Sequence, residues 1–273
     1  MKVILEIALV KLGGSVISDK EKLKTFSRKN VDSLSAEINS YLSESSDRRV
    51  VIVHGGGSFG HVKAKAYSIR EGLKNDSQLK GFAEVRQDMR SLNSRIMGCL
   101  MDRDIASVSL PAESIVSIRD AAVQSEDFTL VDASIAHGMA PVTFGDAVFD
   151  SKRVFTIISG DVLMHSLAGH LRPQVSVFCT DVDGVYDSNP VLNKDARLIR
   201  QLTESTKVSL DESARPDVTG EMRGKLAVLF DIARCSSRTY VVNGRVRGRL
   251  LSALRKDVRR GTEVSTASPL PSG

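Results

Sequence analysis

The chain has 273 residues, a mass of 29.6 kDa and a formal net charge of +5 at pH 7. This length is typical of one large α/β domain or two smaller domains, and it suffices to bury a substantial core. Apolar residues make up 41% and charged residues 26%, which excludes a collagen-like, disordered or membrane-embedded chain. Aromatic residues make up only 5% and Trp is absent, so we expect no stacking platform for single-stranded nucleic acid.

The cysteines are few and far apart, at Cys99, Cys179 and Cys235, and no CxxC motif is present. This spacing favours neither a disulfide framework nor a zinc site, and it predicts a reducing, cytoplasmic location. No apolar run approaches the roughly 18 residues needed to cross a bilayer, so we expect no membrane partner. Glu6 interrupts the apolar N-terminus, which we interpret as a first buried strand and not as a signal peptide.

Short apolar segments alternate with longer amphipathic ones along the chain. This alternation is typical of α/β proteins with a mainly parallel sheet covered on both faces, in which ligands bind at the carboxyl ends of the strands. In chain order we expect a strand at Ile7–Leu12, a helix at Asp32–Leu42, a strand at Val50–His54, a helix at Phe82–Met101, a strand at Val175–Thr180, a helix at Gly224–Cys235 and a strand at Thr239–Asn243.

The first predicted strand ends in Lys11-Leu12-Gly13-Gly14-Ser15, and Lys20 follows shortly after. Glycines allow backbone N–H groups to approach phosphate oxygens closely, and Lys11 would add a fixed positive charge at the strand end. The segment is not a Walker A loop, because GxxxxGK[ST] is absent. Taken alone, it is equally typical of a tight turn with solvated lysines.

The second predicted strand continues into the glycine-rich segment 54–61, His54-Gly55-Gly56-Gly57-Ser58-Phe59-Gly60-His61. Such a run favours an anion site at a helix N-terminus, formed in part by Gly55 and Gly56. His61 would donate a hydrogen bond into that site, whereas His54 is more typical of a structural residue. The alternative is a plain loop with a surface histidine.

Two further turns follow later in the chain. Ser159-Gly160-Asp161 is a weak signal that a plain turn would also explain. The segment 180–186 follows a strand and contains Asp181 and Asp183, which would position Mg²⁺ through water or bind nucleotide hydroxyls. Its Asp-Gly pair is also common in ordinary turns.

The last glycine-containing segment is 217–225, which includes Gly220 and ends at Lys225. Lys225 would open an apolar helix and reach the β- and γ-phosphates of a nucleotide, although a helix start with a solvated lysine fits the same pattern. The stretch from Arg245 to Arg260 is rich in arginine, but its apolar residues predict a solvated helix face and no nucleic-acid partner.

In this order, these motifs resemble the amino acid kinase superfamily, and within it the archaeal-type isopentenyl phosphate kinases. The resemblance runs from about Ile7 to Val264, nearly the whole chain. It implies an open αβα sandwich forming one domain over residues 1–264. Residues 1–170 would bind the phosphate acceptor, residues 171–264 would bind ATP, and residues 265–273 would be a loose tail.

The resemblance also implies the reaction, in which MgATP phosphorylates isopentenyl phosphate to isopentenyl diphosphate in isoprenoid biosynthesis. ATP and Mg²⁺ would be the cofactors and a homodimer the assembly. By motif, the catalytic residues would be Lys11, Lys20, His61 and Lys225. The acceptor would be bound by Gly55, Gly56, His61 and Gly160, and the nucleotide by Lys11, Gly13, Gly14, Ser15, Gly56, Asp181, Gly220 and Lys225.

Two points bear on this interpretation. The family usually has two adjacent glycines where this chain has Gly220-Glu221, so Glu221 would be strained if its φ were positive.

The alternatives are a fosfomycin-type phosphonate kinase and a non-catalytic anion-binding protein of the same fold. An apolar pocket would distinguish the first alternative, because a prenyl tail needs one and a small epoxide does not. The second is disfavoured because an anion-binding protein does not require three lysines. UMP kinases and amino acid kinases usually lack a histidine at the position of His61.

Overall fold

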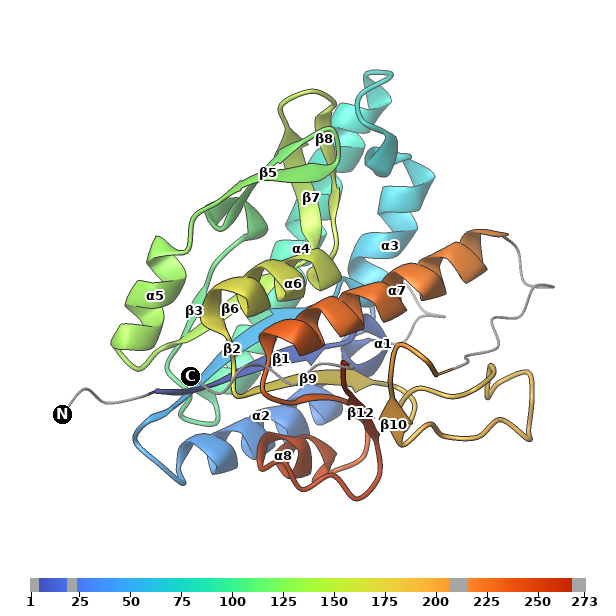
Figure 1. Ribbon diagram of the computed structural model, residues 1–273. Coiled ribbons are helices and arrows are strands. Elements are labelled where there is room, and N and C mark those ends of the chain that lie inside the picture. The colour runs from blue at the N-terminus through green and yellow to red at the C-terminus, as the bar shows by residue number, and fades with distance from the viewer. Residues whose placement is uncertain (1–4, 19–23, 207–215, 267–273) are drawn as a thin grey trace.

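The computed structural model describes residues 5–18, 24–206 and 216–266, with the backbone alone for 216–223. The elements, shown in Figure 1, follow in chain order. They are β1 (Glu6–Leu12), α1 (Gly14–Ile17), α2 (Arg28–Leu42), β2 (Arg48–His54), α3 (Gly57–Ala66), the 3₁₀ turn η1 (Ile69–Glu71), α4 (Ser77–Met101), β3 (Ser107–Ser109), the 3₁₀ turn η2 (Ala112–Ser114), β4 (Val116–Arg119), β5 (Ala122–Glu126), α5 (Thr129–Ala136), β6 (Ala140–Phe144), β7 (Asp146–Asp150), β8 (Val154–Ile158), α6 (Gly160–Leu171), β9 (Val175–Thr180), β10 (Gln201–Leu202), α7 (Pro216–Cys235), β11 (Thr239–Asn243), α8 (Arg249–Leu254) and β12 (Thr262–Val264).

The described strands form two sheets. The larger has eight strands in the order β10-β12-β11-β9-β1-β2-β6-β3, and all neighbouring pairs are parallel except β11 with β12. Strand β1 lies between β2 and β9, so the first strand of the chain occupies the interior of the sheet. Within the described residues, no helix combines the length and apolarity required to cross a lipid bilayer.

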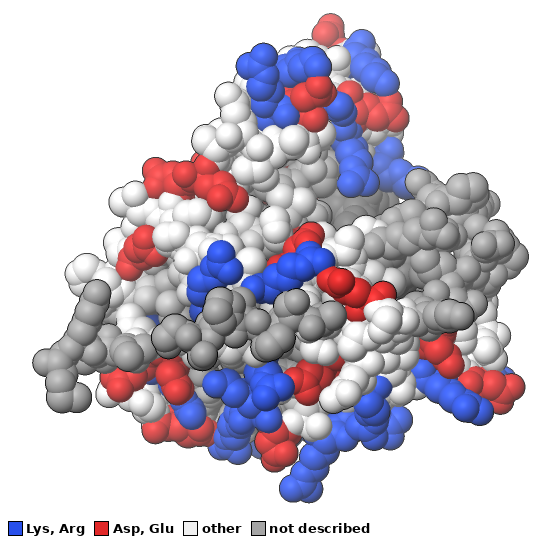
Figure 2. All heavy atoms as spheres, viewed as in Figure 1, with Lys and Arg blue, Asp and Glu red and all other residues white. Residues whose placement is uncertain are grey.

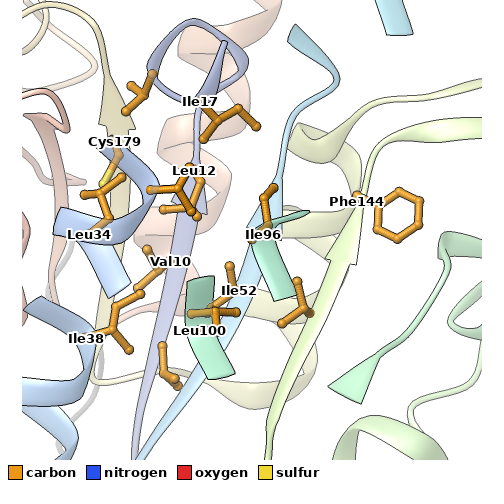
Figure 3. Packing of buried hydrophobic residues seen from close by; sticks show 14 of the residues in the cluster. Val10, Leu12, Ile17, Leu34, Ile38, Ile52, Ile96, Leu100, Phe144 and Cys179 are labelled. Atoms are coloured by element: carbon orange, nitrogen blue, oxygen red, sulfur yellow. The ribbon is translucent and has the colours of Figure 1, made fainter. Parts of the chain in front are cut away.

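Helices cover both faces of the large sheet, which confirms the predicted αβα sandwich. Successive side chains of a strand point to opposite faces. Val10 and Leu12 of β1 accordingly pack against Leu34 and Ile38 of α2, whereas Leu9 packs in a second cluster with residues of α5, α6 and α7. Figure 3 shows the first cluster, and Figure 1 shows α5, α6 and α7 together on the near side of the sheet. The central strands β2, β6 and β9 are therefore buried over most of their length, which accounts for their largely apolar sequences.

The smaller sheet has the order β5-β4-β7-β8 and projects beyond the large one (Figure 1). It packs against α4 through aromatic rings, with Phe82 stacked on Phe155 at 5.0 Å between centroids. At its base, Arg90 of α4 forms an ion pair with the buried carboxylate of Asp146, at 2.8 Å. These short strands were not predicted from the sequence.

The predicted elements agree with the structure most closely at their C-terminal ends. The strand predictions for 175–180 and 239–243 match β9 and β11 in full, and those for 7–12 and 50–54 match the ends of β1 and β2. The predicted helices at 32–42 and 82–101 end at the right residues, but α2 and α4 begin earlier, at Arg28 and Ser77. The residues missed at each start contain a single apolar side chain, Val31 in α2 and Leu79 in α4, which is too few to show an apolar period.

The prediction that Lys225 opens a helix is wrong. Helix α7 begins at Pro216, so Gly220, Gly224 and Lys225 all lie inside it. Proline is favoured in the first turn of a helix, and a single interior glycine costs only about 1 kcal/mol, so these glycines do not stop the helix. Helical backbone has negative φ, so the strain considered for Glu221 does not arise in α7.

A buried carboxylate links helix α2 near the N-terminus with helix α8 near the C-terminus. Glu37 of α2 is only 6% exposed, and its two oxygens accept hydrogen bonds from the N–H groups of Gly248 and Leu251, at 2.8 and 2.9 Å. These are N–H groups of the N-cap and first turn of α8, which have no acceptor within the helix. The negative charge also suits the positive end of the helix dipole.

We expect Glu37→Gln to lower the free energy of unfolding by about 1–2 kcal/mol, because one oxygen and the charge that caps α8 are lost. Urea denaturation at pH 7 measures this change. Glu126→Gln, at an exposed position on β5, is the matched control and should stay within about 0.5 kcal/mol of the wild type. Equal effects of the two substitutions would contradict the capping role.

Candidate active site

The candidate site lies at the carboxyl edge of the large sheet, where four central strands end at one level. The register aligns the last residues of β6 and β2 with Leu12 of β1 and Cys179 of β9. A glycine follows β6, β2 and β1, and its N–H continues the ladder to the neighbouring strand. These bonds run from Gly145 to the His54 carbonyl (3.2 Å), from Gly55 to the Leu12 carbonyl (3.0 Å) and from Gly13 to the Cys179 carbonyl (3.0 Å).

The turns after β1 and β2 touch each other through their backbones. A Cβ atom on Gly14 would lie 2.6 Å from the Gly57 nitrogen, and one on Gly55 would lie 2.9 Å from the Gly14 nitrogen. A Cβ on Gly13 would lie 2.5 Å from the Cys179 carbonyl oxygen. No side chain fits at these distances, so the glycine-rich motifs are required by packing as well as by any ligand.

Lys11 lies beside the turn that precedes α6. Its Nζ forms an ion pair with the carboxylate of Asp161, and it lies 5.7 Å from the centre of the Phe178 ring. Gly160 is adjacent, because a Cβ on it would lie 3.7 Å from Lys11 Cε. Asp161 is in the first turn of α6, whose N-cap residue Ser159 accepts a hydrogen bond from the Val162 N–H. The pair thus holds a partly buried cation at the centre of the carboxyl edge.

Asp161 was not predicted as a site residue, although it belongs to the Ser159-Gly160-Asp161 motif. One aspartate after a glycine carries little information, and only the fold brings it to Lys11. Gly145 was missed for the same reason, since Phe144-Gly145 resembles an ordinary strand end.

Helix α3 begins directly after the turn that follows β2, as predicted. Its N-cap is Gly56, and the carbonyl of Gly56 accepts hydrogen bonds from Phe59 and Gly60, at 3.0 and 3.2 Å. The N–H of Ser58 donates to Ser18 Oγ at 2.9 Å. The N–H groups of Ser58, Phe59 and Gly60 are therefore already used within the protein, which limits the predicted anion site to those of Gly56 and Gly57.

Of the other predicted catalytic residues, His61 and Lys225 are on two helices of the described structure. His61 is an exposed residue of α3, one turn after Gly57, and side chains of a helix lean toward its N-terminus. Lys225 is an exposed residue of α7, which covers the face of the sheet where Lys11 and α6 lie. Lys20 lies outside the described residues.

The two aspartates in the turn after β9 differ in their contacts. Asp183 accepts a hydrogen bond from Asn243 Nδ2 at 3.1 Å and forms an ion pair with Arg260 Nε at 2.6 Å. Asp181 makes no hydrogen bond or ion pair within the part of the chain that the structure describes. Asp181 is thus the carboxylate of this turn that remains available to a nucleotide or to Mg²⁺ held by its phosphates. Among the described residues, no three His, Cys, Asp or Glu side chains are grouped to hold a metal ion by themselves.

The arginine-rich C-terminal stretch is largely used in contacts within the protein. Arg245 donates to the Ser15 carbonyl at 2.6 Å, Arg260 pairs with Asp183, and Arg255 pairs with Glu44. Figure 2 shows acidic side chains interspersed with the basic ones on the face in view. Arg245 and Arg260 therefore fasten the C-terminal segment to turns at the carboxyl edge, whereas Arg255 fastens it to the segment between α2 and β2.

His54 is a structural residue, as expected. Its ring is fully buried, stacks on Phe144 at 5.0 Å, and contacts the Gly55 carbonyl at 3.0 Å and Asn93 Oδ1 at 3.2 Å. Burial lowers the pKa of His54 to about 4, although the hydrogen bonds to Gly55 and Asn93 oppose this shift. Val85, Met89 and Ile96 of α4, considered as walls for an apolar acceptor tail, are likewise buried core residues.

Residues 6–243 match the amino acid kinase family. An isopentenyl phosphate kinase of Methanothermobacter thermautotrophicus is 34% identical over 265 residues, covering 94% of this chain and 98% of the relative. X-ray structures of isopentenyl phosphate kinase include a chain with a TM-score of 0.81 and 31% identity, covering 95% of this chain and 100% of that chain. The product complex of the T. acidophilum enzyme has a TM-score of 0.78 and 28% identity, covering 94% and 99%.

The neutral His54 ring predicts a specific acid dependence of stability. Between pH 6.5 and about 4 the unfolded chain protonates this ring and the folded chain does not, so stability falls as the pH falls. At pH 5 the loss relative to pH 7 is about 2 kcal/mol. We expect His54→Gln to remove this part of the loss, as measured by urea denaturation at both pH values.

Burial also raises the pKa of Asp146 to about 6 despite the nearby Arg90, which stabilises the fold as the pH falls from 6 and so opposes the effect of His54. Both proteins contain Asp146, so their difference isolates the His54 contribution. The exposed His137→Gln variant is the control and should keep the wild-type acid dependence. An unchanged acid dependence in His54→Gln would show that the buried ring does not control it.

Proposed function

The chain belongs to the amino acid kinase family, within its isopentenyl phosphate kinases, and from this premise we propose that it transfers the γ-phosphoryl group of ATP to isopentenyl phosphate. The observation that carries the proposal is the meeting of Lys11 with the glycine turns after β1, β2, β6 and β8 at one edge. The isopentenyl phosphate kinases that are similar to this chain align with it over nearly their whole length, which supports the same activity.

On the acceptor side, Gly55, Gly56, His61 and Gly160 would bind the phosphate of the substrate. This phosphate carries a charge of roughly −1.5 to −2 at pH 7, by analogy with phosphorylated side chains, so it is already a nucleophile. No general base is needed to create it. His61 would act as a hydrogen-bond donor that orients the phosphate, in line with its position above the first turn of α3.

On the nucleotide side, Lys11, Gly13, Gly14, Ser15, Gly56, Asp181, Gly220 and Lys225 would surround ATP. We divide the domain at about residue 170, at the end of α6, with the acceptor bound mainly by the preceding residues and ATP by those that follow. Mg²⁺ is expected to enter with ATP and to be held chiefly by phosphate oxygens and water, as is usual for this ion. Asp181 is the protein carboxylate that would help to hold it.

The chemistry is an attack of an acceptor phosphate oxygen on the γ-phosphorus of ATP, with ADP as the leaving group. The main difficulty is the repulsion between two polyanions, and such reactions depend on positioning and charge neutralisation. Lys11, Lys20 and Lys225 would supply positive charge around the transferring group. Asp161 would hold the Lys11 side chain in place through their ion pair and would supply no positive charge itself.

The assembly and location are also proposals. We propose a homodimer on the basis of the family resemblance, and a cytoplasmic location on the basis of three free cysteines without a disulfide in the described structure.

The direct test is ADP release from MgATP in the presence of isopentenyl phosphate, with fosfomycin as a parallel acceptor. Turnover with isopentenyl phosphate alone is the expected result. Turnover with fosfomycin alone would assign the protein to the phosphonate kinases instead. No turnover with either acceptor, at protein concentrations where the fold is intact by circular dichroism, would overturn the proposal.

A second prediction concerns Asp161. We expect Asp161→Asn to lower kcat by about 10–100-fold with smaller changes in both KM values, because Lys11 loses the charge that orients it. Steady-state kinetics with ATP and isopentenyl phosphate measure this. Asp132→Asn, which removes a surface carboxylate paired with His170, is the matched control and should leave kcat unchanged. A kcat for Asp161→Asn within twofold of the wild type would remove the ion pair from the mechanism.

A further inference from the structure

The turn after β11 lies against both of the turns proposed to bind the nucleotide. It consists of residues 243–245, none of which was predicted as a site residue, and we call it the β11 turn. The N–H of Gly244 donates to the Thr180 carbonyl at the end of β9, at 2.9 Å. A Cβ atom on Gly244 would lie 2.8 Å from Cys179 Cβ and 3.0 Å from Val16 Cγ1, so the β11 turn packs directly on β9 and on α1.

Asn243 holds the turn after β9 from one side. Its Nδ2 donates to Asp183 Oδ1 at 3.1 Å, and its Oδ1 accepts a hydrogen bond from the N–H of Arg245 at 3.0 Å. Arg260 Nε lies 2.6 Å from the other oxygen of Asp183, so this carboxylate is held from two directions. The carboxamide of Asn243 therefore connects Asp183 with the backbone of the β11 turn. Asp181 lies only two residues before Asp183, so its position depends on the same contacts.

Arg245 reaches from the β11 turn to α1. Its Nη2 donates to the Ser15 carbonyl at 2.6 Å, although the two residues are 230 positions apart in the sequence. Helix α1 has only four residues, and so short a helix is not stable by itself. Its carbonyls therefore depend on donors from other parts of the chain, as the Val16 carbonyl does on Asn30 Nδ2 of α2, at 3.0 Å. The C-terminal segment supplies such a donor through Arg245.

The hydrogen bond from Arg245 engages the end of α1 that is opposite to the turn at residues 13–15. Carbonyl groups of a helix point toward its C-terminal end, and N–H groups point toward its N-terminal end. The N–H groups of Gly14 and Ser15, which are proposed to bind nucleotide phosphates, are therefore on the other side of α1 from the Ser15 carbonyl. Arg245 can thus fix this turn through α1, without contact with the nucleotide.

We propose that Arg245 is a positioning residue for the nucleotide. Through the Ser15 carbonyl it fixes residues 13–15, and through Asn243 the same β11 turn fixes residues 180–184, so that the two nucleotide-binding turns keep a constant separation. The inference rests on the proposed kinase function for the identity of the ligand. Turns that are already fixed in the binding conformation bind a ligand more tightly, because less conformational freedom is lost on binding.

The binding test measures the Kd of the magnesium complex of AMP-PNP, an ATP analogue that does not transfer its γ-phosphoryl group, by isothermal titration calorimetry. We expect Arg245→Met to raise this Kd about tenfold. The Kd of isopentenyl phosphate should stay within twofold of the wild type, because its proposed binding residues follow β2 and β8. Arg247→Met removes the same charge from an exposed position two residues further on and is the matched control, which should change neither Kd by more than twofold.

The structural test is hydrogen exchange of the ligand-free protein, measured by mass spectrometry of peptides that cover residues 12–18 and 180–186. Arg245→Met should increase deuterium uptake at 12–18, and Asn243→Ala should increase it at 180–186. Uptake in α4 and α6 should not change, and Arg247→Met should leave both turns as in the wild type. A lower nucleotide affinity of Arg245→Met with unchanged uptake at 12–18 would show that Arg245 acts by its charge alone, which would overturn the proposal.

These two tests separate the inference from the proposed function. If the wild type binds AMP-PNP but does not phosphorylate isopentenyl phosphate, the proposed function fails, and a lower affinity with increased uptake in Arg245→Met would still support the positioning role. If the wild type is active and Arg245→Met changes neither the nucleotide Kd nor uptake at 12–18, the function stands and the positioning role is wrong. Increased uptake throughout the protein would assign Arg245 to general stability and would also contradict the proposal.

Discussion

The structure depends on the direct contact between the backbones of two turns. Gly14 after β1 and Gly57 after β2 approach so closely that a single methyl group on either side would collide with the other chain segment. The contact arises because parallel neighbours β1 and β2 are in a register that ends both strands at the same level. It fixes where α1 and α3 begin, and hence where the N–H groups, Ser18 and Ser58 lie. A site for two polyanions needs close backbone approach and little side-chain bulk, and this contact provides both.

Because β1 is pleated, its alternate side chains face the two different helix layers that contribute to the site. Lys11 shares the face of Leu9, where α6 supplies Asp161 and α7 contains Lys225. The neighbouring residues Val10 and Leu12 face the opposite layer, to which Phe59 of α3 also belongs. Lys11 therefore reaches the edge from one layer, and helix α3 reaches it from the other. The two sets meet only at the edge, where the strands end and no side chains of the core intervene.

Much of this arrangement was predictable from sequence, for reasons that differ between elements. Strand ends were placed well because a glycine after a β-branched run, as at His54-Gly55, marks a change in backbone conformation. The starts of α2 and α4 were missed because one apolar residue in each first turn is too few to show a period. Gly220 and Gly224 suggested a helix boundary, yet α7 runs through both, because the remaining turns of the helix pack on the sheet. The small sheet was missed because its strands are short and partly exposed, as the segment Ala122–Glu126 illustrates.

Within the site, local motifs identified the turns but not the partners. Lys11, Gly13, Gly55 and Gly160 could be found as single signals, since each lies beside a strand end. The pairing of Lys11 with Asp161 joins residues far apart in sequence, and nothing near either residue announces it. The same holds for Asp183, whose availability to a ligand is decided by Arg260 and Asn243 and not by its own motif. Motifs locate the edge of the sheet, and the fold determines which side chains there are already engaged.

The interior position of β1 has a consequence for how the chain is made. The first strand must wait for β9, which begins at Val175, before its second edge is covered. Until then an apolar strand presents unpaired N–H and C=O groups, which is the arrangement that promotes association between nascent or truncated chains. Pairing over such a sequence separation also slows folding, because the intervening loop must be closed first. The portions before and after about residue 170 are joined by the pairing of β1 with β9, so either portion expressed alone would leave one edge of its strand unpaired.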